Sequence, residues 1–292
     1  MSRATIIFPS LSLVLVAVLH GCSDGKIDNE ASDAAIGGDA STQDSSVAVD
    51  AGNQEDSSVE DSGTDSSSDV GVDAGPPSGA LTFDGADDHV ILPAATGGAN
   101  EGAFTAELWF KGKTLTAGLF EVYGSGADRM LSLNAGKVCF YVYGPPVQVC
   151  TTATTYSDGE WHHAAGTVGS GGMHLYVDGA LAAGAATPTQ STFTNDVGFE
   201  IGAGHVSFNS AIYRLAGAID EVRVWSVERS AADILANYKQ HLAGSTAGLQ
   251  GYWKLDGTGS DAKAHDETPG AHDGTLTNFS FTSSPWLTAG AF

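Results

Sequence analysis

The amino-acid composition of the chain changes near residue 80, and this change determines how much of the chain can fold. Residues 23–79 contain no Phe, Trp, Tyr, Leu or Met and are rich in Ser, Asp, Ala, Gly and Val. Such a segment cannot bury enough apolar surface to offset the entropy lost on ordering. From residue 80 onward, apolar and polar residues alternate in short runs such as Phe104–Lys111, which is typical of β-strands. We therefore predict a disordered acidic linker followed by one folded domain over residues 80–292.

The acidic charge is concentrated in the predicted linker. The chain has 12 Lys and Arg against 35 Asp and Glu, for a formal net charge of −23. Residues 23–79 hold 14 acidic residues and one Lys, a net charge of −13. A surface of this sign repels phosphate backbones, so the sequence argues against nucleic acid as a partner.

The N-terminus has the pattern of a signal peptide. Arg3 precedes an apolar run from Ile6 to Val18. This run is shorter than the roughly 20 apolar residues that a membrane span needs. We therefore interpret residues 1–21 as a signal peptide and exclude them from the folded domain.

The residues that end this segment, Leu19-His20-Gly21-Cys22, resemble the lipobox of bacterial lipoproteins. The resemblance implies that Cys22 carries lipid and begins the mature chain, with residues 22–79 forming a lipidated tether. It implies attachment to the bacterial cell envelope, and Ser23 after the cysteine favours the outer membrane. The alternative is an ordinary signal peptide with a cysteine that is not lipidated.

The pattern after residue 80 predicts an all-β fold. Asp178-Gly179 stands between two apolar runs and is a strong signal for a two-residue hairpin turn. Turn signals at this spacing favour about a dozen short strands in a sandwich or barrel. One helix is expected where Ser230 and Asp233 form a capping box. Its buried face would hold Ile234, Leu235 and Tyr238, and Gly244 would end it.

Cys139 and Cys150 flank a predicted hairpin. A loop over residues 143–146, closed by Val142 and Val147, places the two cysteines opposite each other in a non-hydrogen-bonded pair. An exported protein meets oxidising conditions, and we therefore predict a disulfide between them. The alternative is two free thiols on paired strands. Zinc is disfavoured, because no further His or Cys stands at finger spacing.

Four stretches together resemble the laminin-G-like jelly roll of the concanavalin A-like lectin/glucanase superfamily. The resemblance implies two antiparallel sheets packed face to face. The stretches are Leu81–Val90, Phe104–Phe110, Asp158–Ala164 with Leu175–Gly179, and Gly217–Trp225 with the capped helix after it.

The tail departs from the order that is usual in this family. The segments Gly251–Asp256 and Asp273–Asn278 resemble the part that usually precedes the Leu81 strand. We therefore expect the tail to return and take the sheet position of the missing first strand. Its apolar residues would then lie in the core; they are Trp253, Leu255, Leu276 and Trp286.

Calcium is the leading hypothesis for a bound ion. Asp84, Asp87 and Asp88 lie within five residues of a predicted turn, and hard cations take several oxygen ligands. Members of the resembled family often bind calcium, and Asp220 lies in the motif that resembles the edge of their site. Simple turn and surface roles for these aspartates remain the alternative.

No motif for catalysis is present. The paired carboxylates of glycosidases in this superfamily, set as Glu-x-Asp-x-x-Glu, are absent, as are the Gly-x-Ser-x-Gly and His-Glu-x-x-His patterns. Aromatic residues near predicted turns could stack on sugar rings or could be half-buried strand residues, and the sequence does not choose between these roles. They are Tyr123, Tyr141, Tyr143, Tyr156, Phe208 and Tyr213.

Taken together, these patterns favour a non-catalytic, lipid-anchored binding domain. The resemblance implies a glycan as its ligand. It leaves open whether glycan binding depends on calcium. A protein of the cell envelope, bound through an adhesion or scaffold surface, is the alternative partner. Degradation of a polysaccharide is the less favoured alternative.

Overall fold

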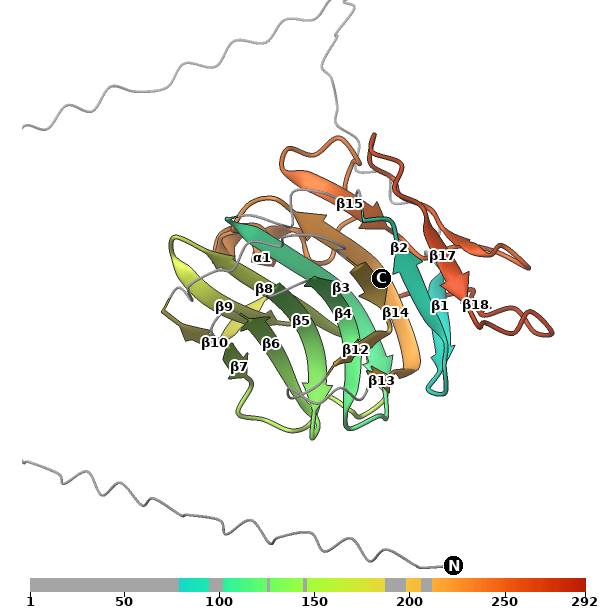
Figure 1. Ribbon diagram of the computed structural model, residues 1–292, viewed down its shortest axis with the longest axis horizontal. Coiled ribbons are helices and arrows are strands. Elements are labelled where there is room, and N and C mark those ends of the chain that lie inside the picture. Colours follow the sequence, from blue (N-terminus) through green and yellow to red (C-terminus); the bar gives the residue numbers. More distant parts are fainter. Residues whose placement is uncertain (1–78, 95–101, 125–126, 144–145, 187–197, 206–211) are drawn as a thin grey trace, which may run out of the picture. The chain divides into compact units, whose positions relative to one another are not determined.

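A computed structural model describes residues 79–94, 102–124, 127–143, 146–186, 198–205 and 212–292. The predicted signal peptide, Cys22 and nearly all of the linker lie outside these residues, and they stay predictions. Two antiparallel sheets face each other in the described part of the chain (Figure 1). This confirms the predicted all-β jelly-roll sandwich with one short helix.

Sheet A contains eight strands, seven of them on one path, and β15 pairs with β14 beside that path. In spatial order its strands are β10 (Ala180–Ala185), β9 (Gly172–Val177), β8 (His162–Gly169), β3 (Phe104–Gly112), β14 (Ala216–Trp225), β1 (Ala80–Asp84) and β18 (Trp286–Leu287), with β15 at Leu249–Trp253.

Sheet B also contains eight strands, and a further two-stranded hairpin pairs with neither sheet. In spatial order the strands of sheet B are β16 (Lys263–Ala264), β17 (Gly274–Thr277), β2 (His89–Leu92), β11 (Gly198–Ile201), β4 (Ala117–Gly124), β5 (Ala127–Asn134), β6 (Lys137–Tyr143) and β7 (Val147–Cys150). The hairpin consists of β12 (Ala203–His205) and β13 (Ile212–Arg214).

One large core lies between the two sheets. Side chains alternate along each strand, so that Phe120 and Val122 of β4 point into the core while Glu121 between them belongs to the outer face. Phe104 and Leu108 of sheet A are fully buried in the same core. This arrangement is the one expected for two packed sheets.

The predicted tail strands are confirmed, and they join both sheets. β15 pairs with β14 and β18 pairs with β1 in sheet A, whereas β17 pairs with β2 in sheet B. The four apolar residues predicted for the core are all buried there: Trp253, Leu255, Leu276 and Trp286. The end of the chain therefore completes a sandwich that residues 79–247 begin.

Local turn signals are also confirmed. Asp178 and Gly179 both have positive φ, of 52° and 79°, as the two-residue turn between β9 and β10 requires. Helix α1 (Ala231–Asn237) begins at the capping box of Ser230 and Asp233. Among the described residues, no helix is long and apolar enough to cross a membrane.

The predicted end and buried face of α1 are partly wrong. The helix is capped at Tyr238 rather than continuing to Gly244, and Leu235 is 61% exposed although Ile234 is fully buried. The Tyr238 ring stacks on Trp109 at a centroid distance of 5.7 Å, and the Tyr238 carbonyl accepts a hydrogen bond of 2.7 Å from Trp109 Nε1. The Tyr238 carbonyl, which a longer helix would use for its own backbone hydrogen bond, is therefore bound by Trp109 instead.

A buried charged network lies on the outer face of sheet A. Arg223 contacts Glu221 (Nη2–Oε2, 2.6 Å) and Glu107 (Nη1–Oε1, 3.8 Å), and all three side chains are about 1% exposed. Glu107 also accepts a hydrogen bond of 2.9 Å from Trp225 Nε1. Burial alone would raise the pKa of Glu107, but the contact with His163 and the charge of Arg223 lower it to about 2. The network therefore holds Glu107 ionised.

Candidate functional site

The turn between β1 and β2 carries the three predicted calcium ligands. Asp84 Oδ1 accepts a hydrogen bond of 2.7 Å from Ala86 N, and Asp88 Oδ2 accepts one of 3.0 Å from Asp84 N. Gly85 has a φ of 81°, and a Cβ there would lie 2.7 Å from the Cβ of Ala216. The sequence Asp-Gly therefore allows a tight turn in which the carboxylates are held by backbone N–H groups.

The carboxylates of Asp84, Asp87 and Asp88 converge in this turn, and we call these three residues the aspartate turn. One oxygen from each lies within 4.8 Å of the others. Asp84 and Asp87 are exposed, whereas Asp88 is 5% exposed. The Asp88 Oδ1 atom is buried and has no hydrogen-bond partner among the described residues. Burial also raises the pKa of Asp88.

Asp220 does not join the aspartate turn, so this part of the predicted ligand set is a correction. In the pairing of β1 with β14, Asp84 lies opposite Ala216, four residues before Asp220. Asp220 lies opposite Trp109 of β3 instead, and its Oδ2 accepts a hydrogen bond of 2.8 Å from Ala291 N. Burial raises the pKa of Asp220 to about 8, and the nearby charge of Glu221 adds to this shift.

A second group of side chains that could contact a ligand lies on the outer face of sheet B. The strand register places Glu200, Glu121, Met130 and Tyr141 side by side on β11, β4, β5 and β6. Tyr213 of β13 packs on Met130 and Tyr141 and so covers part of this row. The β12–β13 hairpin approaches closely because Gly118 lacks a side chain: a Cβ there would lie 2.1 Å from the carbonyl carbon of Ala203.

The neighbouring row on this face consists of Tyr123, Asp128 and Tyr143, and we call it the tyrosine row. Tyr123 lies opposite Asp128, and Asp128 lies opposite Tyr143. Tyr123 Oη donates a hydrogen bond of 3.1 Å to Glu200 Oε1. Tyr143 is 42% exposed. Burial and the hydrogen-bonded Glu121 raise the pKa of Asp128 far above its usual range.

The tyrosines of this face could be proposed from the sequence, but its acidic residues were missed; these are Glu121, Asp128 and Glu200. The available signal for two of them is period-two alternation, because Glu121 stands between Phe120 and Val122 and Glu200 stands between Phe199 and Ile201, which are core residues. Phe208, another predicted aromatic candidate, lies outside the described residues. Tyr156 lies elsewhere, with its ring against His162 at a centroid distance of 5.1 Å.

A family model described as the concanavalin A-like lectin/glucanases superfamily matches residues 84–235, just over half of the 292 residues. The chain belongs to this superfamily. The match includes the aspartate turn and the tyrosine row, and it ends before the tail strands that complete the sandwich. Among curated proteins, none matches the chain.

Solved structures of this superfamily fold resemble the chain at low sequence identity. One is described as a "putative carbohydrate binding protein" from Bacteroides ovatus ATCC 8483; it is 23% identical, with a TM-score of 0.57, over 74% of this chain and 61% of that chain. The chain thus spans less than two thirds of that protein. Domains LG4-5 of the mouse laminin alpha1 chain are 16% identical, with a TM-score of 0.44, over 55% of this chain and 46% of that chain. A heptameric SAP-like pentraxin from Limulus polyphemus is 12% identical, with a TM-score of 0.43, over 55% and 82%.

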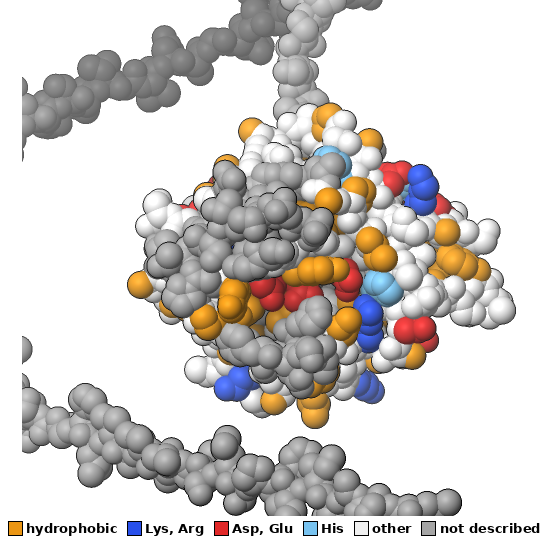
Figure 2. Space-filling view, viewed as in Figure 1, with side chains coloured by type: hydrophobic (Ala, Val, Ile, Leu, Met, Phe, Trp, Pro, Cys, Tyr) orange, Lys and Arg blue, Asp and Glu red, His pale blue; other side chains and the backbone are white. Residues whose placement is uncertain are grey.

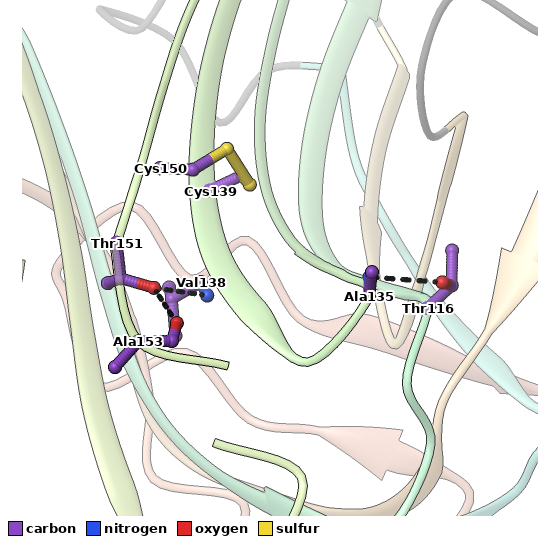
Figure 3. Close-up of a disulfide and its surroundings, with 7 residues drawn as sticks. All are labelled: Thr116, Ala135, Val138, Cys139, Cys150, Thr151 and Ala153. Carbon is purple, nitrogen blue, oxygen red and sulfur yellow. Dashed lines mark hydrogen bonds between the residues drawn. A yellow bond between two sulfur atoms is a disulfide. The ribbon is translucent and has the colours of Figure 1, made fainter. Parts of the chain in front are cut away.

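The predicted disulfide between Cys139 and Cys150 is confirmed. Cys139 and Cys150 lie opposite each other on β6 and β7, with a Cα–Cα distance of 4.1 Å and a bond between their sulfur atoms (Figure 3). Val142 lies opposite Val147, as the predicted loop requires. The residues next to the two cysteines are also in contact, since Thr151 Oγ1 accepts a hydrogen bond of 3.2 Å from Val138 N (Figure 3).

Replacing both Cys139 and Cys150 with Ala is expected to lower the free energy of unfolding by about 3 kcal/mol, because the bridge restricts the unfolded chain. Urea titration of the variant and of the oxidised and reduced parent chain measures this loss. The reduced parent should unfold close to the variant. Identical midpoints for the oxidised and reduced parent would contradict the prediction.

His162 links two turns of the superfamily domain. Its Nδ1 lies 3.0 Å from Asp178 Oδ2, and its Nε2 lies 3.4 Å from an oxygen of Asp158. The hydrogen bond with Asp178 raises the pKa of His162, although burial opposes the shift. His163, the next residue, is 1% exposed, with Nε2 lying 3.4 Å from Glu107 Oε2. The two histidines therefore have structural roles in the described part of the chain.

His162→Gln is expected to destabilise the domain more at pH 5.5 than at pH 8.5. A pKa raised above the usual value stabilises the fold below the unfolded pKa, and this contribution is lost as pH rises through the folded pKa. The effect should stay below about 1 kcal/mol because the pair is partly exposed. Urea unfolding of both chains at the two pH values tests it. A destabilisation that is equal at both pH values, or larger at pH 8.5, would rule out this linkage.

Proposed function

We propose that residues 80–292 form a non-catalytic glycan-binding domain that requires calcium and is held at the bacterial cell envelope by a lipid on Cys22. Membership of the concanavalin A-like superfamily supports the binding role. The Bacteroides ovatus structure supports it as well, since it shares the fold and is described as a "putative carbohydrate binding protein". The strongly negative chain argues against a nucleic acid as the partner.

The carboxylates of sheet A support binding without cleavage. Glycoside hydrolysis needs two carboxyl groups held about 5 to 9.5 Å apart across the scissile bond. Glu221 is 1% exposed and is engaged by Arg223, Tyr252 and His241, so it is not presented to a substrate. Asp220 is fully buried under the Ala291 backbone. We therefore propose no catalytic residue.

One observation carries the calcium proposal, namely the buried Asp88 Oδ1 atom that lacks a partner among the described residues. A buried carboxylate oxygen without a partner is costly, and a cation would remove this cost. Calcium takes oxygen ligands at about 2.4 Å, so two ligands on opposite sides lie about 4.8 Å apart. The aspartate turn matches this spread, with one oxygen from each residue within 4.8 Å of the others.

Calcium is expected to raise the melting temperature of the parent chain and to give heat on titration. Asp88→Asn should abolish both responses, because it replaces the buried, negatively charged carboxylate of the aspartate turn with a neutral amide. Asp220→Asn is the matched control and should keep the full response, since Asp220 lies opposite Trp109. Differential scanning calorimetry and isothermal titration measure the two effects. No response in the parent chain, or an equal loss in both variants, would overturn the calcium site.

A glycan array, probed with and without a chelator, tests the proposed ligand class. Binding that disappears on chelation supports the whole proposal, and binding that survives chelation would remove only the calcium requirement. A blank array under both conditions would overturn glycan binding. A specific pull-down of one envelope protein would then favour the adhesion role.

The anchor and the location are tested separately. Mass spectrometry of the mature N-terminus should find a lipidated Cys22, and fractionation should place the protein in the outer membrane. An unmodified N-terminus at another residue would refute the anchor. This result would leave the binding proposal for residues 80–292 unaffected.

A further inference from the structure

We propose that the tyrosine row of Tyr123, Asp128 and Tyr143 binds uncharged oligosaccharides on the outer face of sheet B. The proposal rests on the proposed glycan-binding function and adds both the surface and the class of glycan. Figure 2, in the same view as Figure 1, shows acidic side chains close together near the middle of the molecule, with hydrophobic side chains, a class that includes tyrosine, beside them.

The two tyrosines provide flat rings on either side of a carboxyl group. Tyr123 stands on β4 and Tyr143 on β6, and Asp128 lies between them on β5. Neighbouring strands are about 4.8 Å apart, so the two tyrosine positions are about 10 Å apart. Aromatic faces attract the C–H surfaces of sugar rings through dispersion. A ligand that contacts both rings must therefore contain more than one sugar ring.

Asp128 supplies the hydrogen-bonding group of the row. Burial raises the pKa of Asp128, and the hydrogen-bonded carboxyl group of Glu121 raises it further, so the pair holds a proton. Asp128 Oδ1 is buried and has no hydrogen-bond partner among the described residues. Because this atom is buried, a sugar hydroxyl reaches it only when neighbouring side chains of the row move aside, and the hydroxyl then donates a hydrogen bond to it. The row thus combines an unsatisfied acceptor with two rings.

Charge selects the class of glycan. Glu121 and Glu200 stand in the row beside the tyrosines, and the nearby Arg214 lies with its Nη1 3.6 Å from Glu200 Oε2. Arg214 and Glu200 therefore neutralise each other, and the Glu121–Asp128 pair, which shares one proton, keeps one negative charge. An acidic glycan would bring its carboxylate or sulfate groups against this charge. The surface is consequently suited to uncharged sugars and disfavours uronic, sialic and sulfated ones.

Tyr143→Ala in the full chain tests the surface, because Tyr143 is 42% exposed and its loss should leave the fold intact. Phe281→Ala is the matched control, since Phe281 is similarly exposed at 38% but lies between β17 and β18. Asp128→Ala tests the carboxyl group, because it removes both carboxyl oxygens. Isothermal titration with neutral oligosaccharides should show affinity reduced by about tenfold or more in Tyr143→Ala and Asp128→Ala. The control should stay within about twofold, and circular dichroism should show all variants folded.

The outcomes separate this inference from the proposed function. If neutral glycans bind the parent chain and both variants equally, the tyrosine row is not the site, although glycan binding itself stands. If carboxylated or sulfated oligosaccharides bind more tightly than neutral ones, the proposed ligand class is wrong. If no glycan binds the parent chain, the proposed function fails and this inference fails with it.

Discussion

Removal of residues 248–292 is expected to leave a chain that no longer melts cooperatively. The deletion takes away β15, β16, β17 and β18 and thus exposes the edges of β1, β2 and β14. It also removes four buried core side chains, and the loss of each large one costs about 2–5 kcal/mol. Their sum, about 8–20 kcal/mol, is as large as the total stability of about 5–15 kcal/mol that is typical of a domain. The side chains are Trp253, Leu255, Leu276 and Trp286.

Thermal melting followed by circular dichroism measures this loss. A chain that lacks residues 23–78 is the control and should melt as the parent does, because the sequence predicts no folded structure there. A cooperative transition of residues 80–247 at the parent temperature would show that the tail is dispensable. It would also refute the role of the tail strands in both sheets.

Arg223→Met is expected to lower the free energy of unfolding by about 3–5 kcal/mol, since it leaves carboxylates buried without their charge partner. Arg223 contacts both Glu221 and Glu107, and the three side chains are about 1% exposed. Burial opposes the ionised state of Glu107, so the charge of Arg223 is one of the contacts that keep its pKa low. Urea unfolding at neutral pH measures the loss, and failure to obtain folded protein would be a stronger form of the same result.

Lys263→Met provides a matched control for the buried network. Lys263 Nζ lies 3.3 Å from Asp273 Oδ2, but its side chain is 59% exposed. An exposed ion pair contributes about 0–1 kcal/mol, so this variant should differ little from the parent. If Arg223→Met and Lys263→Met lowered the free energy of unfolding equally, burial of the Arg223 network would not explain the loss.

Features of the fold that depend on local sequence could be predicted well. The capping box at Ser230 and the Asp178-Gly179 turn need only a few neighbouring residues, and both are present as expected. Cys139 and Cys150 are joined by one hairpin, so counting outward from its loop was sufficient to pair them. The buried tail residues followed from the resemblance of the tail to a strand segment that the chain otherwise lacks.

Features that depend on contacts between distant segments could be predicted less well. Asp220 stands in a motif that resembles the edge of the calcium site in related proteins, but the register of β14 against β1 and β3 places it opposite Trp109. The end of α1 is set by the contact of Tyr238 with Trp109, which no local signal contains. The tyrosine row combines residues of three strands, and their register fixes which side chains are neighbours.

The electron density of a crystal soaked with calcium and a neutral oligosaccharide tests the central claim of a calcium-dependent glycan-binding domain most directly. We predict an ion coordinated by the carboxylates of Asp84, Asp87 and Asp88, and a sugar lying over Tyr123, Asp128 and Tyr143. An aspartate turn without an ion in excess calcium, together with no sugar on the outer face of sheet B, would contradict the account.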